Sequence, residues 1–308
     1  MDGSAARIWP PLARCIAAEA RLGAWALARG PIVAGCYEFL RFGVKQAWAC
    51  LFGGLICALL IASYLFYPQD APLSRYDALT LAVVAIQVAL LGLRMETWEE
   101  AKVIALYHGV GTVMELFKTA VGSWVYPEAS VLRLAGVPLF TGFLYASIGS
   151  YIARVWRLFD FRFIRHPPLR LTLPLAAGIY LNFFAHHFVW DMRLPLMALS
   201  VLLFGRTFVY FKVWRVHRRM PLVVGFLLVA LFIWIAENIG TASRIWLYPN
   251  QHAGWAVVPW GKFGSWYLLM IVSYVLVTLV SRPRDIRRSA RGEDRPLEGA
   301  GSVVGRLS

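Results

Sequence analysis

The sequence predicts an all-α, polytopic membrane protein with about eight transmembrane helices arranged as two tandem four-helix repeats. The first observation is composition: hydrophobic residues fill 59% of the 308 positions and charged residues only 16%, against about 25% charged in soluble domains. The second is a series of apolar runs long enough to cross a bilayer. The third is a residue pattern that occurs twice. The formal net charge is +14, so the placement of the basic residues tests the topology.

Eight runs of mostly apolar residues approach the roughly 20 residues that a helix needs to cross the hydrocarbon core. They are residues 49–67, 77–94, 103–121, 137–156, 171–190, 194–211, 221–240 and 259–280. The first contains no charged residue, and the last contains only Lys262. The fifth and sixth lie close together around Asp191 and Arg193, so the boundary between them is the least defined.

The basic residues are divided unequally between the two sides that eight spans define. Twenty-five lie at the termini or in loops on the same side, four lie on the other side, and two lie within spans. Because cytoplasmic loops carry an excess of Lys and Arg, both termini are predicted to be cytoplasmic. The expected partner is the lipid bilayer. We expect no nucleic-acid binding, because that function needs a soluble basic domain, which this sequence lacks.

Four segments follow from this reading. Residues 1–48 form a cytoplasmic or interfacial N-terminal segment, because charged residues interrupt the apolar stretch that a signal peptide requires. Within it, residues 13–29 are expected to form an amphipathic helix on the membrane surface. Residues 49–158 and 159–280 are the first and second four-helix repeats. Residues 281–308 form a basic cytoplasmic tail that is expected to be disordered.

The internal repeat has the pattern E-x3-T-A-x3-W-x-Y-P. It begins at Glu115 and recurs at Glu237, with a constant offset of 122. Each copy is followed by a loop and a Val-Pro pair, and the upstream pair at 41–42 (Arg-Phe) matches the pair at 162–163. Because each repeat holds an even number of spans, both halves are predicted to share one orientation, related by an axis along the membrane normal.

Ionisable and polar residues inside the predicted spans are the candidate functional groups, because they are costly in a bilayer. The candidate acid–base residues are Glu115, Glu237, His108 and Lys118. Lys118 is three residues from Glu115 and can pair with it, and His108 lies two turns deeper on that face. Since His108 aligns with an alanine in the second half, Glu115 is the preferred proton donor or acceptor and Glu237 the supporting residue. The candidate substrate-binding residues are Trp124, Tyr126, Trp246, Tyr248, Asn182, His186, His187 and Asn238.

Structural roles are the alternative for each of these groups. The two glutamates are then buried ion-pair partners of Lys118 and Lys262, and the aromatic residues only end helices at the outer interface. A metal site built from His108, His186, His187 and the acids is chemically possible, because imidazole and carboxylate suit zinc or iron. The spacing gives it no support beyond residue type, so we assign no metal site, and no cofactor is indicated. A second charged cluster is expected to be a solvated salt-bridge network at the cytoplasmic surface. It comprises Arg94, Glu96, Glu99, Glu100 and Lys102.

Several runs resemble a bacterial integral-membrane family that is catalogued as domain of unknown function 817. They are RFGVKQAWACLFGG, ETWEEAKVIALYHGVGTVMELFKTAVGSWVYPE, GSYIARVWRLFDFRF, VYFKVWRVHRRMPL and FIWIAENIG, and the resemblance covers about residues 40–281. It implies a multi-pass protein of the bacterial inner membrane. No activity is carried over from that family.

A second resemblance concerns the order of a Glu, an aromatic-x-Tyr, a loop and a Pro-led helix. This order is similar to that in the small membrane lycopene cyclases and carotenoid hydratases, which are acid-catalysed isoprenoid enzymes. The resemblance implies that Glu115 and Glu237 match their intramembrane acids. The sequence departs from the cyclases where they have Pro-x-Glu-Glu, because it reads Pro-Leu-Phe at 138–140 and Pro-Trp-Gly-Lys at 259–262.

Two classes of function follow from these residues, and a purely structural role is the third. The first is an enzyme that acts on an apolar, isoprenoid-like or lipid substrate, in which a buried carboxyl group donates a proton to an alkene. Aromatic faces would stabilise the developing cation. The second is a small-solute or proton-coupled transporter that uses the same acids as its binding sites.

Overall fold

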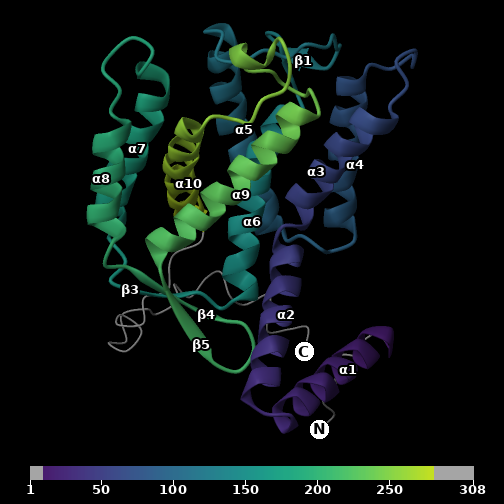
Figure 1. Ribbon diagram of the computed structural model, residues 1–308, viewed down its shortest axis with the longest axis vertical. Coiled ribbons are helices and arrows are strands. Elements are labelled where there is room, and N and C mark those ends of the chain that lie inside the picture. The colour runs from purple at the N-terminus through teal and green to yellow at the C-terminus, as the bar shows by residue number, and fades with distance from the viewer. Residues whose placement is uncertain (1–9, 281–308) are drawn as a thin grey trace.

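The computed structural model describes residues 10–280, with side chains from residue 17 onward. The described chain is mostly helical and forms an elongated bundle (Figure 1). The α-helices are α1 (Pro10–Ala28), α2 (Pro31–Ala49), α3 (Leu51–Phe66), α4 (Arg75–Gly92), α5 (Trp98–Ala120), α6 (Thr141–Leu158), α7 (Leu169–Ala185), α8 (Arg193–Phe204), α9 (Leu222–Ala242) and α10 (Trp260–Val280). The strands are β1 (Arg133–Leu134), β2 (Val137–Pro138), β3 (Arg162–Ile164), β4 (Phe208–Lys212) and β5 (His217–Pro221).

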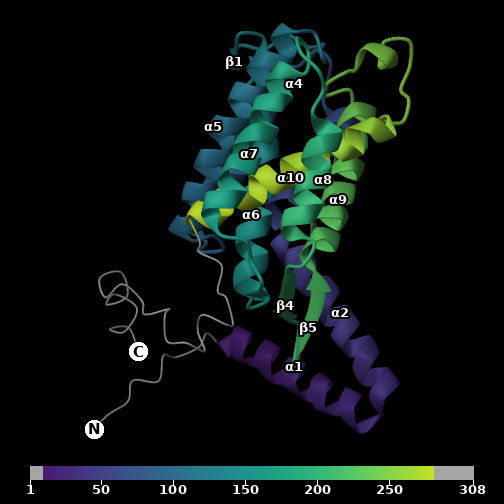
Figure 2. The ribbon, with the colours of Figure 1, turned by 90° about the vertical axis from the view of Figure 1, so that its left-hand side faces the viewer.

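Helix α10 lies at the centre of the bundle and packs against α5, α6, α7, α8 and α9. Its middle is a continuous buried stretch from Tyr267 to Val275. Helices α1 and α2 and the strands β3, β4 and β5 lie at one end of the molecule, whereas β1 and the loop before α10 lie at the other (Figures 1 and 2). We call these the sheet end and the loop end.

The membrane prediction holds at a coarser level than eight spans. Within residues 10–280, three helices, α4, α9 and α10, are long and apolar enough to cross a bilayer. Helices α2 and α3 form a fourth candidate as a pair bent by 70°. Helices α7 and α8 are apolar but shorter. Eight helices, α3 to α10, do lie at the eight predicted runs, but length and composition qualify only some of them as spans.

Two small sheets correct the all-α prediction. In the run predicted to span 194–211, the helix ends at Phe204, and Gly205, a residue of low helix propensity, is its C-cap. The chain then forms β4, whose aromatic and β-branched residues suit a strand. The sheet has the antiparallel order β3–β4–β5, and β1 and β2 form a second antiparallel pair.

The two predicted halves contain corresponding elements in the same order. Helices α3, α5 and α6 of the first half occupy the sequence positions of α7, α9 and α10 of the second. The two Trp-x-Tyr loops meet in the structure, where Val125 and Leu247 exchange two backbone hydrogen bonds of 3.0 Å. These two residues are themselves equivalent at the offset of 122. The Arg-Phe match does not extend to structure, since 41–42 lie in α2 and 162–163 lie in β3.

Helices α5 and α9 end in the same hydrogen-bonded turn. In α5, Ser123 N–H donates to the Lys118 carbonyl and Gly122 N–H donates to that of Thr119. In α9 the residues 122 positions later make the same two bonds. This turn requires a left-handed residue after the helix, which is Gly122 (φ 71°) in one copy and Arg244 (φ 53°) in the other.

The two turns predict opposite effects of substitution. Gly122→Ala should destabilise the protein, and Arg244→Gly should stabilise it, each by about 1 kcal/mol, because only glycine adopts the left-handed region without a steric cost. Unfolding of the two purified variants in detergent measures both values. Equal signs for the two substitutions would contradict the common turn geometry.

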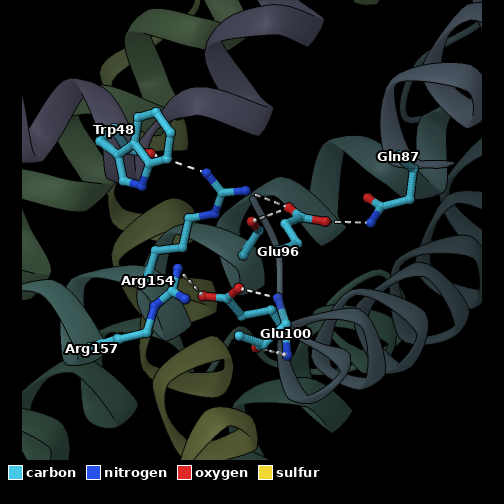
Figure 3. Close-up of polar contacts among 8 residues, drawn as sticks. Trp48, Gln87, Glu96, Glu100, Arg154 and Arg157 are labelled. Atoms are coloured by element: carbon cyan, nitrogen blue, oxygen red, sulfur yellow. Dashed lines mark hydrogen bonds and ion pairs between the residues drawn. The ribbon is translucent and has the colours of Figure 1, made fainter. Parts of the chain in front are cut away.

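The charged cluster around residues 94–102 corrects another prediction. Glu99 and Lys102 do form an exposed pair of 2.8 Å. Glu96, however, is buried and binds Arg154 of α6 at 2.8 Å, with both side chains 0% exposed. Glu100 is also buried and pairs with Arg157 at 3.2 Å (Figure 3). The cluster therefore joins α5 to α6 inside the protein. Arg154 lies in α6, which continues to Leu158.

Candidate functional site

A cavity of about 200 Å³ lies within the helical bundle. Its wall is mainly apolar and is formed by helices α3, α5, α6, α7, α9 and α10. The two Trp-x-Tyr loops and the first residue of α8 complete it. Both predicted acids line this one cavity, together with these predicted residues: Lys118, Trp124, Tyr126, Asn182, His186, Trp246 and Tyr248.

Glu115 is buried at the loop end of α5 and accepts three hydrogen bonds from aromatic side chains. Trp124 Nε1 donates to its Oε2 at 2.9 Å, and the Tyr126 hydroxyl donates to the same oxygen. The Tyr145 hydroxyl of α6 donates to Oε1 at 2.7 Å. Tyr145 reaches this position because its ring packs directly on Gly111, where any Cβ would meet the ring at 2.6 Å.

Glu237 occupies the corresponding position in α9 and is equally buried. The Tyr248 hydroxyl donates to its Oε1, and Trp266 Nε1 of α10 donates to its Oε2. Tyr248 is the counterpart of Tyr126, and Trp266 follows Tyr145 by 121 positions. Each half therefore holds a carboxyl group between a tyrosine of the loop and an aromatic donor of the following helix.

The lysines do not pair with the acids, which corrects the predicted ion pairs. No carboxylate of the described residues lies within ion-pair distance of Lys118 or Lys262. Lys118 Nζ instead lies 2.8 Å from Nε2 of His187 and 4.2 Å from the centre of the Phe183 ring. Lys262 Nζ lies over the ring of Tyr248 at 4.3 Å. The glutamates are thus held by neutral donors, and the lysines by imidazole and aromatic faces.

A polar group at the start of α8 borders the cavity. Arg193 Nε donates to Oδ2 of Asp191 at 2.6 Å, and its Nη1 donates to Ser265 of α10 at 3.3 Å. Asn182 donates to the same aspartate and accepts from the backbone of Met192. Burial acts to raise the pKa of Asp191, but hydrogen bonds from the backbone and guanidinium of Arg193 outweigh it and hold this pKa below its usual value. Asp191 is therefore ionised at neutral pH and is matched by Arg193.

Three predicted site residues lie outside the cavity wall. His108 packs its ring on Phe143 at 4.4 Å, and its buried Nδ1 lacks a hydrogen-bond partner among the described residues. His187 is exposed and contacts two residues of the cavity wall, Lys118 and His186. Asn238 binds the loop before α10, because its Oδ1 accepts from the backbone of Val258 at 2.9 Å. The preference for Glu115 that was based on His108 therefore loses its geometric basis.

The sequence analysis missed Tyr145 and Trp266 as partners of the acids. Neither belongs to the repeated pattern, because they lie one helix further along the chain. The signal that could have found them is the repeat itself, since extending the alignment past the Val-Pro pairs brings two aromatic hydrogen-bond donors to equivalent positions. Arg193 was seen only as a charge between two spans, and Ser265 was not singled out.

Comparison with known proteins places the chain in a family. Residues 38–274 match the model of a protein of unknown function, DUF817. An uncharacterised protein of Bacillus subtilis (strain 168), YoaT, is 42% identical over 248 residues, which cover 80% of this chain and 93% of that protein. The solved structure of the mycobacterial Insig homologue MvINS from Mycobacterium vanbaalenii is similar at a TM-score of 0.43 and 14% identity. That match covers 61% of this chain and 98% of the other. The extent of the family match and the identity to YoaT show that this chain belongs to the DUF817 family of proteins of unknown function.

Proposed function

We propose that this protein is a membrane enzyme that binds an apolar, isoprenoid-like or lipid molecule in the central cavity and transfers protons with Glu115 and Glu237. The observation that carries the proposal is the placement of two buried carboxyl groups in one mainly apolar cavity, each held by aromatic donors rather than by a lysine. An apolar wall favours an apolar ligand through the hydrophobic effect. The carboxyl groups supply the chemistry.

The number of hydrogen bonds to each acid suggests a different role for Glu115 and for Glu237. A carboxylate has about four acceptor positions. Glu115 uses three of them on Trp124, Tyr126 and Tyr145, whereas Glu237 uses two on Tyr248 and Trp266. Glu237 thus keeps more capacity to face a substrate, and we assign it the proton transfer. Glu115 orients the aromatic side chains of the first half. This reverses the order that the sequence favoured.

In addition to the acids, the aromatic rings of the cavity would contribute to the reaction. Protonation of an alkene places positive charge on carbon, and the negative face of an aromatic ring stabilises a cation. Trp124 and Tyr248, which line the cavity, already hold the ammonium of Lys262 against their faces. These rings are therefore oriented to accept positive charge. The same carboxylate then removes a proton from the adjacent carbon, which restores the acid and leaves an isomerised alkene.

Trapping of the bound compound tests this function. Wild-type protein and a Glu237→Gln variant would be purified from the same host membranes, and their apolar extracts compared by mass spectrometry. We expect the variant to hold an unreacted compound that the wild type has converted to an isomer. An unrelated purified membrane protein provides the background. Identical extracts from all three proteins would contradict the proposal. The transporter would be supported instead if wild-type protein in proteoliposomes transported a compound without altering it and the Glu237→Gln variant did not.

We also propose that α3 to α10 all cross the bacterial inner membrane as two tandem repeats, with both termini cytoplasmic. The excess of basic residues on the side of the termini supports this orientation, as does the order of equivalent helices. Single cysteines at Ala253 and Arg215, in a protein whose four native cysteines are replaced by serine, test it. An impermeant maleimide should label residue 253 from outside and residue 215 only after the membrane is opened. Labelling of residue 215 in intact cells would reverse the orientation.

A further inference from the structure

Three cationic side chains, Lys118, Arg193 and Lys262, line the central cavity. They come from α5, α8 and α10, so that the fold rather than local sequence brings them together. Lys262 and Arg193 both act electrostatically on Lys118, and Arg193 acts on Lys262 together with the opposing charges of Glu237 and Glu115. Like charges that share a mainly apolar cavity repel strongly, because the surroundings screen them less than water does. The site therefore favours an added negative charge.

Within residues 17–280, no ion pair supplies that charge to the lysines. Asp191 forms an ion pair of 2.6 Å with Arg193. The oxygens of Glu115 and Glu237 accept bonds from tyrosine and tryptophan donors. In residues 17–280, neither lysine nitrogen has a carboxylate within ion-pair distance. Both ammonium groups are thus available to an anion.

The lysines are held in place without using all their protons. An ammonium group has three donors. Lys118 is only 4% exposed, and among the described residues its nitrogen has one hydrogen-bond partner, His187. Lys262 is fixed by two aromatic faces, those of Tyr248 at 4.3 Å and Trp124 at 5.4 Å. Asn182, His186 and Ser265 line the same cavity and add further polar groups.

We propose that the cavity binds an amphiphile whose anionic head group, a carboxylate or a phosphate, lies between Lys118, Lys262 and Arg193, with its hydrocarbon chain along the apolar wall of α3, α6 and α9. This inference rests on the proposed function, because the hydrocarbon chain is the apolar substrate described above. It adds the chemical class of the head group. Charge-assisted hydrogen bonds to two ammonium groups then fix the chain relative to Glu237.

A set of ligands with one hydrocarbon chain and different head groups tests the proposal. Geraniol, geranic acid and geranyl phosphate would be titrated calorimetrically into the protein in nanodiscs, with empty nanodiscs as the blank. We expect at least one anion to bind about tenfold more tightly than the neutral alcohol. The comparison between the acid and the phosphate identifies the head group.

Two lysine variants and one control locate the site. Lys118→Met and Lys262→Met should each weaken anion binding about tenfold and leave geraniol binding unchanged. Lys118→Arg keeps the charge and should retain most of the affinity, which separates loss of charge from loss of folding. Lys102→Met removes an exposed lysine outside the cavity and should change nothing.

The outcomes separate this inference from the proposed function. If geraniol binds as tightly as both anions, or if the lysine variants weaken the binding of all three ligands equally, the proposal of an anionic head group is overturned. The proposal that the cavity binds an apolar molecule is then retained. If none of the three binds, both proposals are overturned. Tight anion binding that persists in both lysine variants would place the head group elsewhere and overturn the site.

Discussion

Arg154→Met should destabilise the protein by about 3–5 kcal/mol, because removal of one partner from a buried ion pair leaves an uncompensated charge. Arg154 and Glu96 are both fully buried, and the guanidinium also donates to the backbone carbonyl of Trp48 at 3.1 Å. Without Arg154, the partners left to the Glu96 carboxylate among the described residues are Gln87 and Ser150, which donates a bond of 3.3 Å (Figure 3). Denaturant unfolding of the purified protein in detergent measures the loss.

A second substitution distinguishes the cost of the unpaired Glu96 charge from the cost of lost packing. Glu96→Gln in the Arg154→Met background removes the remaining charge, so the double variant should recover most of the lost stability. Lys102→Met breaks an exposed pair with Glu99 and should cost less than about 1 kcal/mol. A double variant that is no more stable than the single one would show that Glu96 is not the charge stranded by the substitution.

Loss of Arg154 should also affect the junction between α2 and α3. Arg154 links α6 to Trp48, which lies just before the break between α2 and α3, where the chain bends by 70°. Glu96, in the turn before α5, is held by the same guanidinium. Loss of Arg154 should therefore loosen the bend as well as the contact between α5 and α6. Faster amide hydrogen exchange around residues 48–52 in the variant would show this effect.

Glu237→Gln is the substitution with the largest expected effect on activity, with a loss of about 10²-fold or more, as is typical when a general acid–base group is removed. Gln keeps the size of the side chain but cannot transfer a proton. The fold should be retained, because the new amide can turn its oxygen to the donor-only Trp266 and its NH₂ to the Tyr248 hydroxyl, which can accept. The measurement is turnover of the compound identified in the trapping experiment, together with the unfolding midpoint.

Glu115→Gln is the matched variant in the other half. It should lower turnover less than Glu237→Gln does, because we assign Glu115 to orient its aromatic neighbours. Tyr126→Phe and Tyr145→Phe, which remove two of its three donors, should reproduce that smaller loss. Equal losses in both glutamate variants would make the two acids an obligate pair, and full activity in Glu237→Gln would refute its assigned role.

Local patterns in the sequence were enough to locate helices α3 to α10 and the two acids of the cavity. Apolar runs gave the positions of α3 to α10, because the length and composition of a run depend only on neighbouring residues. The repeated pattern singled out Glu115 and Glu237, and both line the cavity. The strand β3 was missed because its pairing with β4 joins residues more than 40 positions apart. The local hairpin of β4 and β5 was missed because β4 had been included in the apolar run 194–211.

The partner of each charge was decided only by tertiary structure. Sequence spacing suggested that Lys118 would neutralise Glu115, since residues three apart share a helix face. In the folded protein Glu115 instead meets Tyr145 from α6, while Lys118 turns to His187. Likewise Glu96, which was assigned to a solvated surface, is buried against Arg154. Residue types and helical runs are local properties of a chain, whereas burial and pairing depend on which helices pack together.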